Sequence, residues 1–125
     1  MELVTVQRAK ENLARSHGYE YIDTTVKSNA CPLAPEWEMV MRWKDYEKGI
    51  GDYNEECYTR DYERLLRKRY RANPDWFHEF CQKEKVAVSC FCNRSKFCHR
   101  YLIVNILRKI CDYLGIEFVY IGELY

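Results

Sequence analysis

The chain has 125 residues, of which 47% are apolar, and its 20 basic and 19 acidic side chains leave a formal net charge of +1. This length suits a single domain spanning 1–125, and the composition excludes disordered and fibrous chains. The balanced charge argues against a protein that coats DNA. No apolar run is long enough for a membrane span, and the start lacks a secretory-signal pattern, so we expect a cytoplasmic protein.

Three of the seven cysteines, Cys90, Cys92 and Cys98, lie within nine residues of one another. An odd number of cysteines without a secretory signal argues against a disulfide framework. Reduced thiols are therefore expected, either buried as small apolar groups or used in chemistry. The clustering of these three cysteines points to a site.

Strand-like and helix-like segments alternate along the chain. Strands are predicted at 3–7, 19–26, 85–91 and 117–121, and helices at 8–17, 35–49, 55–72, from Pro74 onward, and at 98–114. The last strand, helix and strand form a βαβ unit, whose strands are parallel. The sequence thus predicts a small Rossmann-like α/β fold with a mostly parallel sheet and helices on both faces.

The turn after Phe91 is the predicted ligand site, because ligands of such sheets bind at the carboxyl ends of the strands. The turn leads into a helix whose N-terminus attracts anions, and Arg100 adds positive charge there. We therefore expect a pocket for a small phosphorylated or nucleotide-like ligand, with Arg100 as the charged clamp. Cys90 and Cys92 share one face of the preceding strand and are candidates to line the pocket.

Three alternatives at this turn stay open. Cys98 at the helix start favours thiolate, and His99 offers a proton acceptor, so Cys98 could be a nucleophile or the redox partner of Cys92. No cofactor is expected under the pocket hypothesis, but Cys90, Cys92, Cys98 and His99 have the ligand types of a Cys₃His zinc centre. Their spacing is unusual, since adjacent Cys98 and His99 would have to converge on one ion. Finally, all these residues could be structural, with Arg100 paired to an acid.

Other candidates lie at strand ends or on the following helix. Asp23, Lys27 and Ser28 end a strand and could reach the same rim as Arg100, or form an ordinary turn. Trp37 could stack on a base, although a core position is the more usual place for such a residue. Glu123 follows the last strand, where it could act as a base or bind a ribose hydroxyl, or be only a tail residue.

Basic residues also recur on the helix predicted at 55–72. A stripe of this kind is compatible with nucleic-acid phosphates. Many acidic neighbours favour instead a solvated, salt-bridged face. Nucleic acid is therefore a weak partner candidate.

The segment Val86 to Arg100, closing on Phe97-Cys98-His99-Arg100, resembles the family called domain of unknown function 488. The chain is most similar to short members from phages, archaeal viruses and prokaryotes. Four further features extend the match over most of the chain: Asp23-Thr24-Thr25-Val26-Lys27-Ser28, Ala34-Pro35-Glu36-Trp37, the residues Tyr58, Tyr62, Asn73 and Trp76, and Ile121-Gly122-Glu123. The resemblance implies a Rossmann-like fold, a pocket at the Cys-His-Arg turn and, for a viral chain, the host cytoplasm.

We expect Arg100, Lys27 and the helix N-terminus to hold the anion of a nucleotide-like ligand, with Cys98 and His99 at the reactive end. If turnover occurs, a nucleotide- or nucleic-acid-processing enzyme acting at a glycosidic or phosphate centre is the preferred class, and Asp23 and Glu123 are acid/base candidates. The alternatives are a zinc-stabilised interaction domain and a non-catalytic protein that sequesters a nucleotide. The sequence leaves the oligomeric state open.

Overall fold

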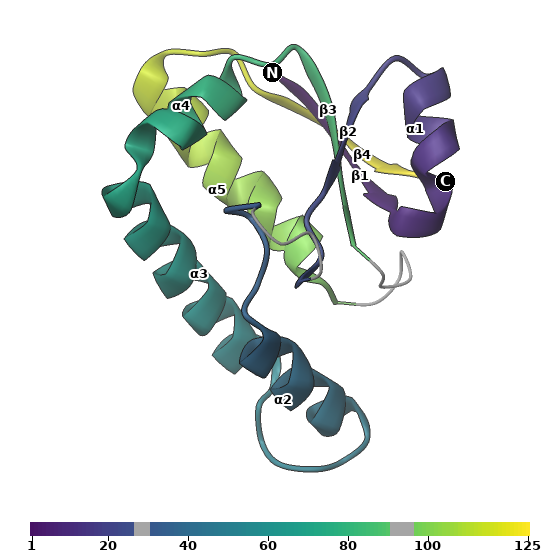
Figure 1. Cartoon of the computed structure of the whole chain (residues 1–125), viewed down its shortest axis with the longest axis vertical. Helices are drawn as coiled ribbons and strands as arrows, with labels where there is room; N and C mark the ends of the chain where they lie inside the picture. Colours follow the sequence, from purple (N-terminus) through teal and green to yellow (C-terminus); the bar gives the residue numbers. More distant parts are fainter. Residues whose placement is uncertain (27–30, 91–96) are drawn as a thin grey trace.

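The computed structural model describes residues 1–26, 31–90 and 97–125, and within them four strands form one sheet (Figure 1). The strands are β1 (Glu2–Gln7), β2 (Glu20–Asp23), β3 (Lys85–Cys90) and β4 (Val119–Leu124). Their order is β2-β3-β1-β4, and each neighbouring pair is parallel. The predicted Rossmann-like α/β fold is confirmed, with a sheet that is wholly parallel over the described residues.

Helices cover both faces of the sheet (Figure 1). They are α1 (Glu11–Ser16), preceded by a 3-10 turn at Arg8–Lys10, α2 (Trp37–Glu47), α3 (Glu55–Ala72), α4 (Pro74–Cys81) and α5 (His99–Leu114). Strand side chains alternate between the faces. Val4 and Ala87 pack with Ala14 of α1, whereas Leu3 and Val86 belong to the larger core formed with α3, α4 and α5. No helix within the described ranges is long and apolar enough to cross a membrane.

The strands β2 and β4 differ most from their predicted bounds. β2 ends at Asp23 rather than at residue 26, because the Asp23 carboxylate accepts a hydrogen bond from the backbone N–H of Thr25 at 2.9 Å and the chain turns there. β4 begins two residues later than predicted, since pairing with β1 starts where Glu2 faces Val119. A register shift follows, and pairing then continues to Leu124.

The helix α2 and the start of α3 lie beyond the carboxyl ends of the strands (Figure 1). Their aromatic side chains interlock, with the rings of Trp43 and Tyr58 6.2 Å apart. Phe97, which immediately precedes the α5 region, packs 5.0 Å from Trp43. The α2–α3 pair therefore forms a wall over the edge of the sheet at which the functional turn was predicted.

Candidate functional site

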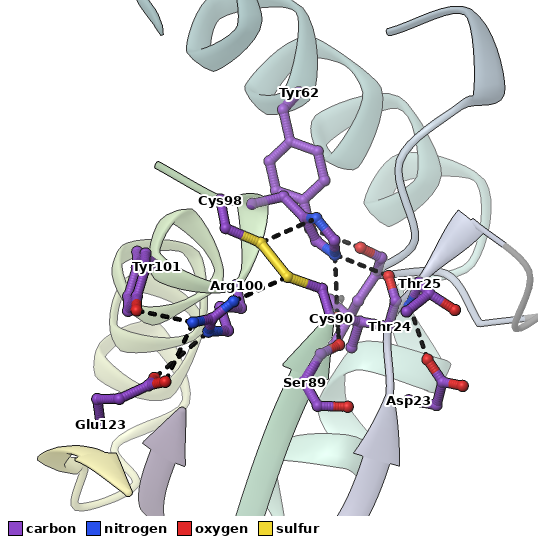
Figure 2. Close-up of a disulfide and its surroundings, with 12 residues drawn as sticks. Asp23, Thr24, Thr25, Tyr62, Ser89, Cys90, Cys98, Arg100, Tyr101 and Glu123 are labelled. Carbon is purple, nitrogen blue, oxygen red and sulfur yellow. Dashed lines mark hydrogen bonds and ion pairs between the residues drawn. A yellow bond between two sulfur atoms is a disulfide. The ribbon is translucent and has the colours of Figure 1, made fainter. Parts of the chain in front are cut away.

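Cys90 and Cys98 meet where β3 ends and α5 begins (Figure 2). Cys90 is the last residue of β3, and Cys98 caps the N-terminus of α5 in an extended conformation. Both side chains are buried, and their sulfur atoms form a disulfide that joins backbones whose Cα atoms are 7.6 Å apart. The expectation of reduced thiols is therefore wrong for this pair. The redox partner suggested for Cys98 from the sequence was Cys92, which lies outside the described residues.

His99, the first residue of α5, has a defined orientation. Its Nε2 lies 2.7 Å from the carbonyl oxygen of Thr24 and 3.0 Å from the Thr24 hydroxyl, which itself donates to the Ser89 carbonyl at 2.6 Å. Because a carbonyl oxygen only accepts, Nε2 must carry the hydrogen. Burial lowers the pKa of His99 to about 4. The neutral ring therefore presents an unprotonated Nδ1, and this atom lies 3.7 Å from the Cys98 sulfur.

Arg100 is fully buried, and its guanidinium group is engaged by protein groups on several sides (Figure 2). It forms an ion pair with Glu123 of β4, with Nη2 3.0 Å and Nε 3.3 Å from the two carboxylate oxygens. Nη1 donates to the Cys90 sulfur at 3.0 Å, and Nη2 also donates to the Tyr101 hydroxyl at 2.9 Å. The guanidinium thus links the end of β4 to the cysteine pair, and after reduction of the disulfide it would stabilise a thiolate at Cys90.

A cavity of about 350 Å³ opens beside the cysteine pair. Aromatic side chains from α2, α3 and the residue before Cys98 form much of its wall: Trp37, Trp43, Tyr58 and Phe97. Cys90, Cys98 and His99 line the cavity too, and we call these three residues the Cys-His floor. Lys44 and Glu47 on α2 are its charged lining residues among those described. The cavity is therefore mainly aromatic, with sulfur and nitrogen donors on one side.

The predicted site residues separate into groups in the structure. Cys90, Cys98 and His99 meet at the floor, and Trp37 lies 54% exposed in the wall rather than in the core. Arg100 and Glu123 are paired with each other behind the floor and do not line the cavity.

The remaining candidates do not join the floor. Asp23 forms the Thr25 turn and a 3.4 Å ion pair with Arg8, so its carboxylate is used within the fold. Lys27, Ser28 and Cys92 lie outside the described residues. Their predicted roles in anion, ligand or metal binding stay predictions.

Several residues that form the site were not identified as functional from the sequence. Thr24, which orients His99, was noted only as part of a motif, because its partner is 75 residues away in the chain. Trp43, which also lines the cavity, was not singled out from the sequence. The spacing of Trp37, Val40, Trp43, Lys44 and Glu47 at helical intervals could have identified one cavity-facing side of α2. Tyr101 had no signal in the sequence.

The basic stripe on α3 carries mixed charge in the structure. Glu55, Glu56 and Glu63 line one shallow depression together with Arg60, Arg64 and Arg67. Arg69 instead points inward and donates to the Pro32 carbonyl at 2.8 Å. This arrangement is typical of a solvated helix face, and nucleic-acid binding by α3 stays a prediction.

The Cys-His floor supports three kinds of chemistry. A thiolate at the floor can act as a nucleophile, with Arg100 as its stabilising cation, because the lowered pKa of His99 makes the imidazole a weak proton acceptor. Two cysteines that meet can exchange between dithiol and disulfide. Two thiolates and an imidazole nitrogen are also a favourable donor set for zinc, and the donor atoms of Cys90, Cys98 and His99 all lie within 4.8 Å of one another.

Comparisons with known proteins support the resemblance noted in the sequence. A family model described as the Active DUF488-N3 subclade matches residues 1–110. Searches of curated proteins and of solved structures returned no match. The matched range includes β1 to β3 and the first part of α5, up to residue 110, and therefore the whole Cys-His floor, but it ends before Glu123.

Proposed function

Since the chain belongs to the DUF488 family, whose membership assigns no reaction, we propose from the site itself that the cavity binds a nucleoside or nucleotide by its base. The observation that carries this proposal is the aromatic wall around a cavity of about 350 Å³. Ligand pockets of this size class hold small molecules, and aromatic side chains stack on any nucleobase. Trp37 supports the proposal most directly, because an exposed indole at a cavity is available for stacking.

Thr25 supports a polar contact with the same ligand. This residue lines the cavity and is only 3% exposed, yet its hydroxyl has no hydrogen-bond partner among the described residues. A buried hydroxyl ordinarily has a partner, since leaving it unsatisfied costs about 1–3 kcal/mol. A carbonyl, ring nitrogen or sugar hydroxyl of the ligand would provide one.

The cationic side chain proposed to face the phosphate of a nucleotide differs from Arg100, the one expected from the sequence. Arg100 is engaged by Glu123 and Cys90, so its proposed role is to hold the Cys90 sulfur in place. Lys44 on α2 is the cationic lining residue among those described and would face the phosphate. The Cys-His floor would then meet the sugar or phosphate, which favours processing at a glycosidic or phosphate centre over simple sequestration.

Tryptophan fluorescence provides the test. Two of the three tryptophans, Trp37 and Trp43, line the cavity, so a bound base should quench emission. We expect saturable quenching and thermal stabilisation with at least one of the common ribo- or deoxyribonucleosides or their 5′-monophosphates. Base stacking contributes about 1–3 kcal/mol, so Trp37→Ala should weaken binding by about 5- to 150-fold.

Tyr113→Ala is the matched control, because this aromatic residue is 78% exposed on α5 and does not line the cavity. Binding should be unchanged in this variant. If no nucleoside or nucleotide shifts the melting temperature, or if Trp37→Ala binds as tightly as the unchanged protein, the base-binding proposal is wrong. Chromatography of the bound ligand separates turnover from sequestration, since only turnover produces a free base or a released phosphate.

A further inference from the structure

We propose that the reduced Cys-His floor is a zinc site, with Cys90, Cys98 and His99 as ligands and a fourth position open to the cavity. The inference concerns the same cavity as the nucleotide proposal. It stands separately, because it is tested with metal alone. It also addresses the difficulty seen in the sequence, which was whether adjacent Cys98 and His99 could converge on a single ion.

The positions of Cys98 and His99 fit a tetrahedral centre. With Zn–S of about 2.3 Å and Zn–N of about 2.0–2.1 Å, neighbouring sulfur and nitrogen ligands lie about 3.6 Å apart. The Cys98 sulfur and His99 Nδ1 are 3.7 Å apart. The extended backbone of Cys98, with φ −157° and ψ 149°, turns into the helix at His99, and this change of direction brings the two side chains together.

Cys90 completes the set from the end of the neighbouring strand. Its Cα atom is 7.6 Å from that of Cys98, beyond the roughly 4.4–6.8 Å usual for two half-cystines. Two thiolates that bind one ion are linked through the metal and need not touch. The backbone spacing is therefore one that a shared ion accommodates.

The surroundings of these donors match those of metal ligands. A metal-bound histidine usually donates its other ring N–H to a carbonyl or carboxylate, as His99 Nε2 does to the Thr24 carbonyl. This hydrogen bond leaves Nδ1 with the lone pair that a metal requires. The Cys90 sulfur accepts a hydrogen bond from Arg100, and such outer contacts hold a thiolate ligand in place.

The charges of the buried groups also balance. Binding requires both thiols to release a proton, while neutral His99 contributes an electron pair without changing its protonation. Two thiolates then neutralise Zn²⁺, and Arg100 behind them is already neutralised by Glu123. A neutral assembly avoids the high cost of an uncompensated buried charge.

The ligand types favour zinc over hard cations. Sulfur and imidazole donors suit zinc, whereas magnesium and calcium take oxygen ligands. A site with three protein ligands keeps a position for water or substrate, as catalytic zinc sites do. Because Cys90, Cys98 and His99 all line the cavity, that position faces the space in which the ligand would lie. Zinc there would supply an activated water or polarise a substrate oxygen.

Cobalt substitution tests the site directly. The full chain would be reduced with a non-chelating phosphine, freed of metal with a chelator that is then removed, and titrated with Co²⁺. We expect one equivalent to bind, with the visible bands of a tetrahedral ion and a sulfur-to-cobalt charge-transfer band, and one equivalent of Zn²⁺ to displace it. The oxidised protein, in which the Cys90–Cys98 disulfide occupies both sulfurs, should not develop this spectrum.

Variants assign the ligands. Cys98→Ser and His99→Gln should each lose the one-equivalent tetrahedral spectrum, while the matched controls Cys57→Ser and His17→Gln, far from the floor in the sequence, should retain it. For variants that fail to fold, the unchanged protein provides the evidence: one equivalent of Zn²⁺ should protect Cys90 and Cys98 from iodoacetamide, as read by peptide mass spectrometry. Absence of one-equivalent binding by the fully reduced protein, or a tetrahedral spectrum that survives Cys98→Ser, would overturn the proposal.

Discussion

The same fold brings together two pairs of cysteines, one near each end of α5, and places them in opposite environments. Cys90 and Cys98 lie at the first turn of the helix, in contact with Arg100 and His99 and beside the cavity. Cys81 and Cys111 lie where α4 meets the last part of α5, both fully buried in the apolar core. Burial and a hydrogen bond with Cys111 raise the pKa of Cys81 to about 12.

This contrast shows that the surroundings of a thiol, and not its burial alone, separate a reactive site from a packing contact. All four side chains are buried, but among the described residues a guanidinium and an imidazole directly contact the sulfur atoms of the first pair, whereas burial is the largest influence on Cys81 in the second. A nearby cation favours thiolate, whereas apolar surroundings keep the thiol protonated. Each cysteine pair can be altered separately in the reduced and metal-free protein.

The largest loss of unfolding free energy is expected for Arg100→Met. This substitution removes the cation beside Cys90 and leaves the Cys90 and Cys98 pair in surroundings closer to those of Cys81 and Cys111. The substitution leaves Glu123 largely buried without its cation, and removing one partner of a buried ion pair costs about 3–5 kcal/mol. Urea unfolding measures this loss. Arg67→Met on the exposed face of α3 is the control and should change stability by no more than about 0.5 kcal/mol. Adding Glu123→Gln to Arg100→Met should restore part of the loss; if it makes the loss larger, the unpaired carboxylate is not its cause.

A smaller loss of unfolding free energy is expected when one cysteine of each pair is replaced by serine. Cys111→Ser places a hydroxyl in apolar surroundings and should cost about 1–3 kcal/mol. Cys90→Ser should cost less than about 1 kcal/mol, because Arg100 can donate to a serine oxygen as it does to the sulfur. Urea unfolding of the two variants side by side gives the comparison. Equal losses would mean that the two environments do not differ energetically.

The smallest perturbation is a brief exposure of the folded protein to iodoacetamide at about pH 8, followed by peptide mass spectrometry. Cys57 is half-buried and should react first. Cys81 and Cys111 should react only after unfolding, since both are buried and the raised pKa of Cys81 keeps it almost wholly protonated at this pH. Cys90 and Cys98 should react at an intermediate rate through the cavity. Labelling of Cys81 as fast as Cys57 would contradict the assignment of the second pair to the core.

Much of the fold follows from local patterns in the sequence. The apolar run that ends at Cys90 predicts β3, and the helical spacing of apolar residues up to Leu114 predicts α5, which Gly115 ends in a left-handed conformation. The bounds of β4 were wrong because they depend on pairing with β1, at the opposite end of the chain. Local preferences contain no information about such a register.

The strand-to-helix turn at which Cys90, Cys98 and His99 meet was predictable, but the contacts among the candidate residues were not. The sequence identified Arg100 and Glu123 separately and assigned both to a ligand, although pairing of Arg100 with an acid was an alternative. The structure joins the two residues, across 23 positions in the chain. The role of Thr24 in orienting His99 depends on its backbone carbonyl. Every residue has such a carbonyl, so the identity of residue 24 does not predict this contact.

The wholly parallel sheet also determines the order in which these contacts can form as the chain folds. His99 meets Thr24 only after a loop of 75 residues has closed. Such distant contacts are slow to form, because the chain loses the entropy of loop closure before the contact contributes any stabilising free energy. Cys90 and Cys98 are eight residues apart and can meet in an unfolded chain. The two sulfurs can therefore find each other early, whereas the imidazole orientation that completes the floor is acquired only with the native sheet.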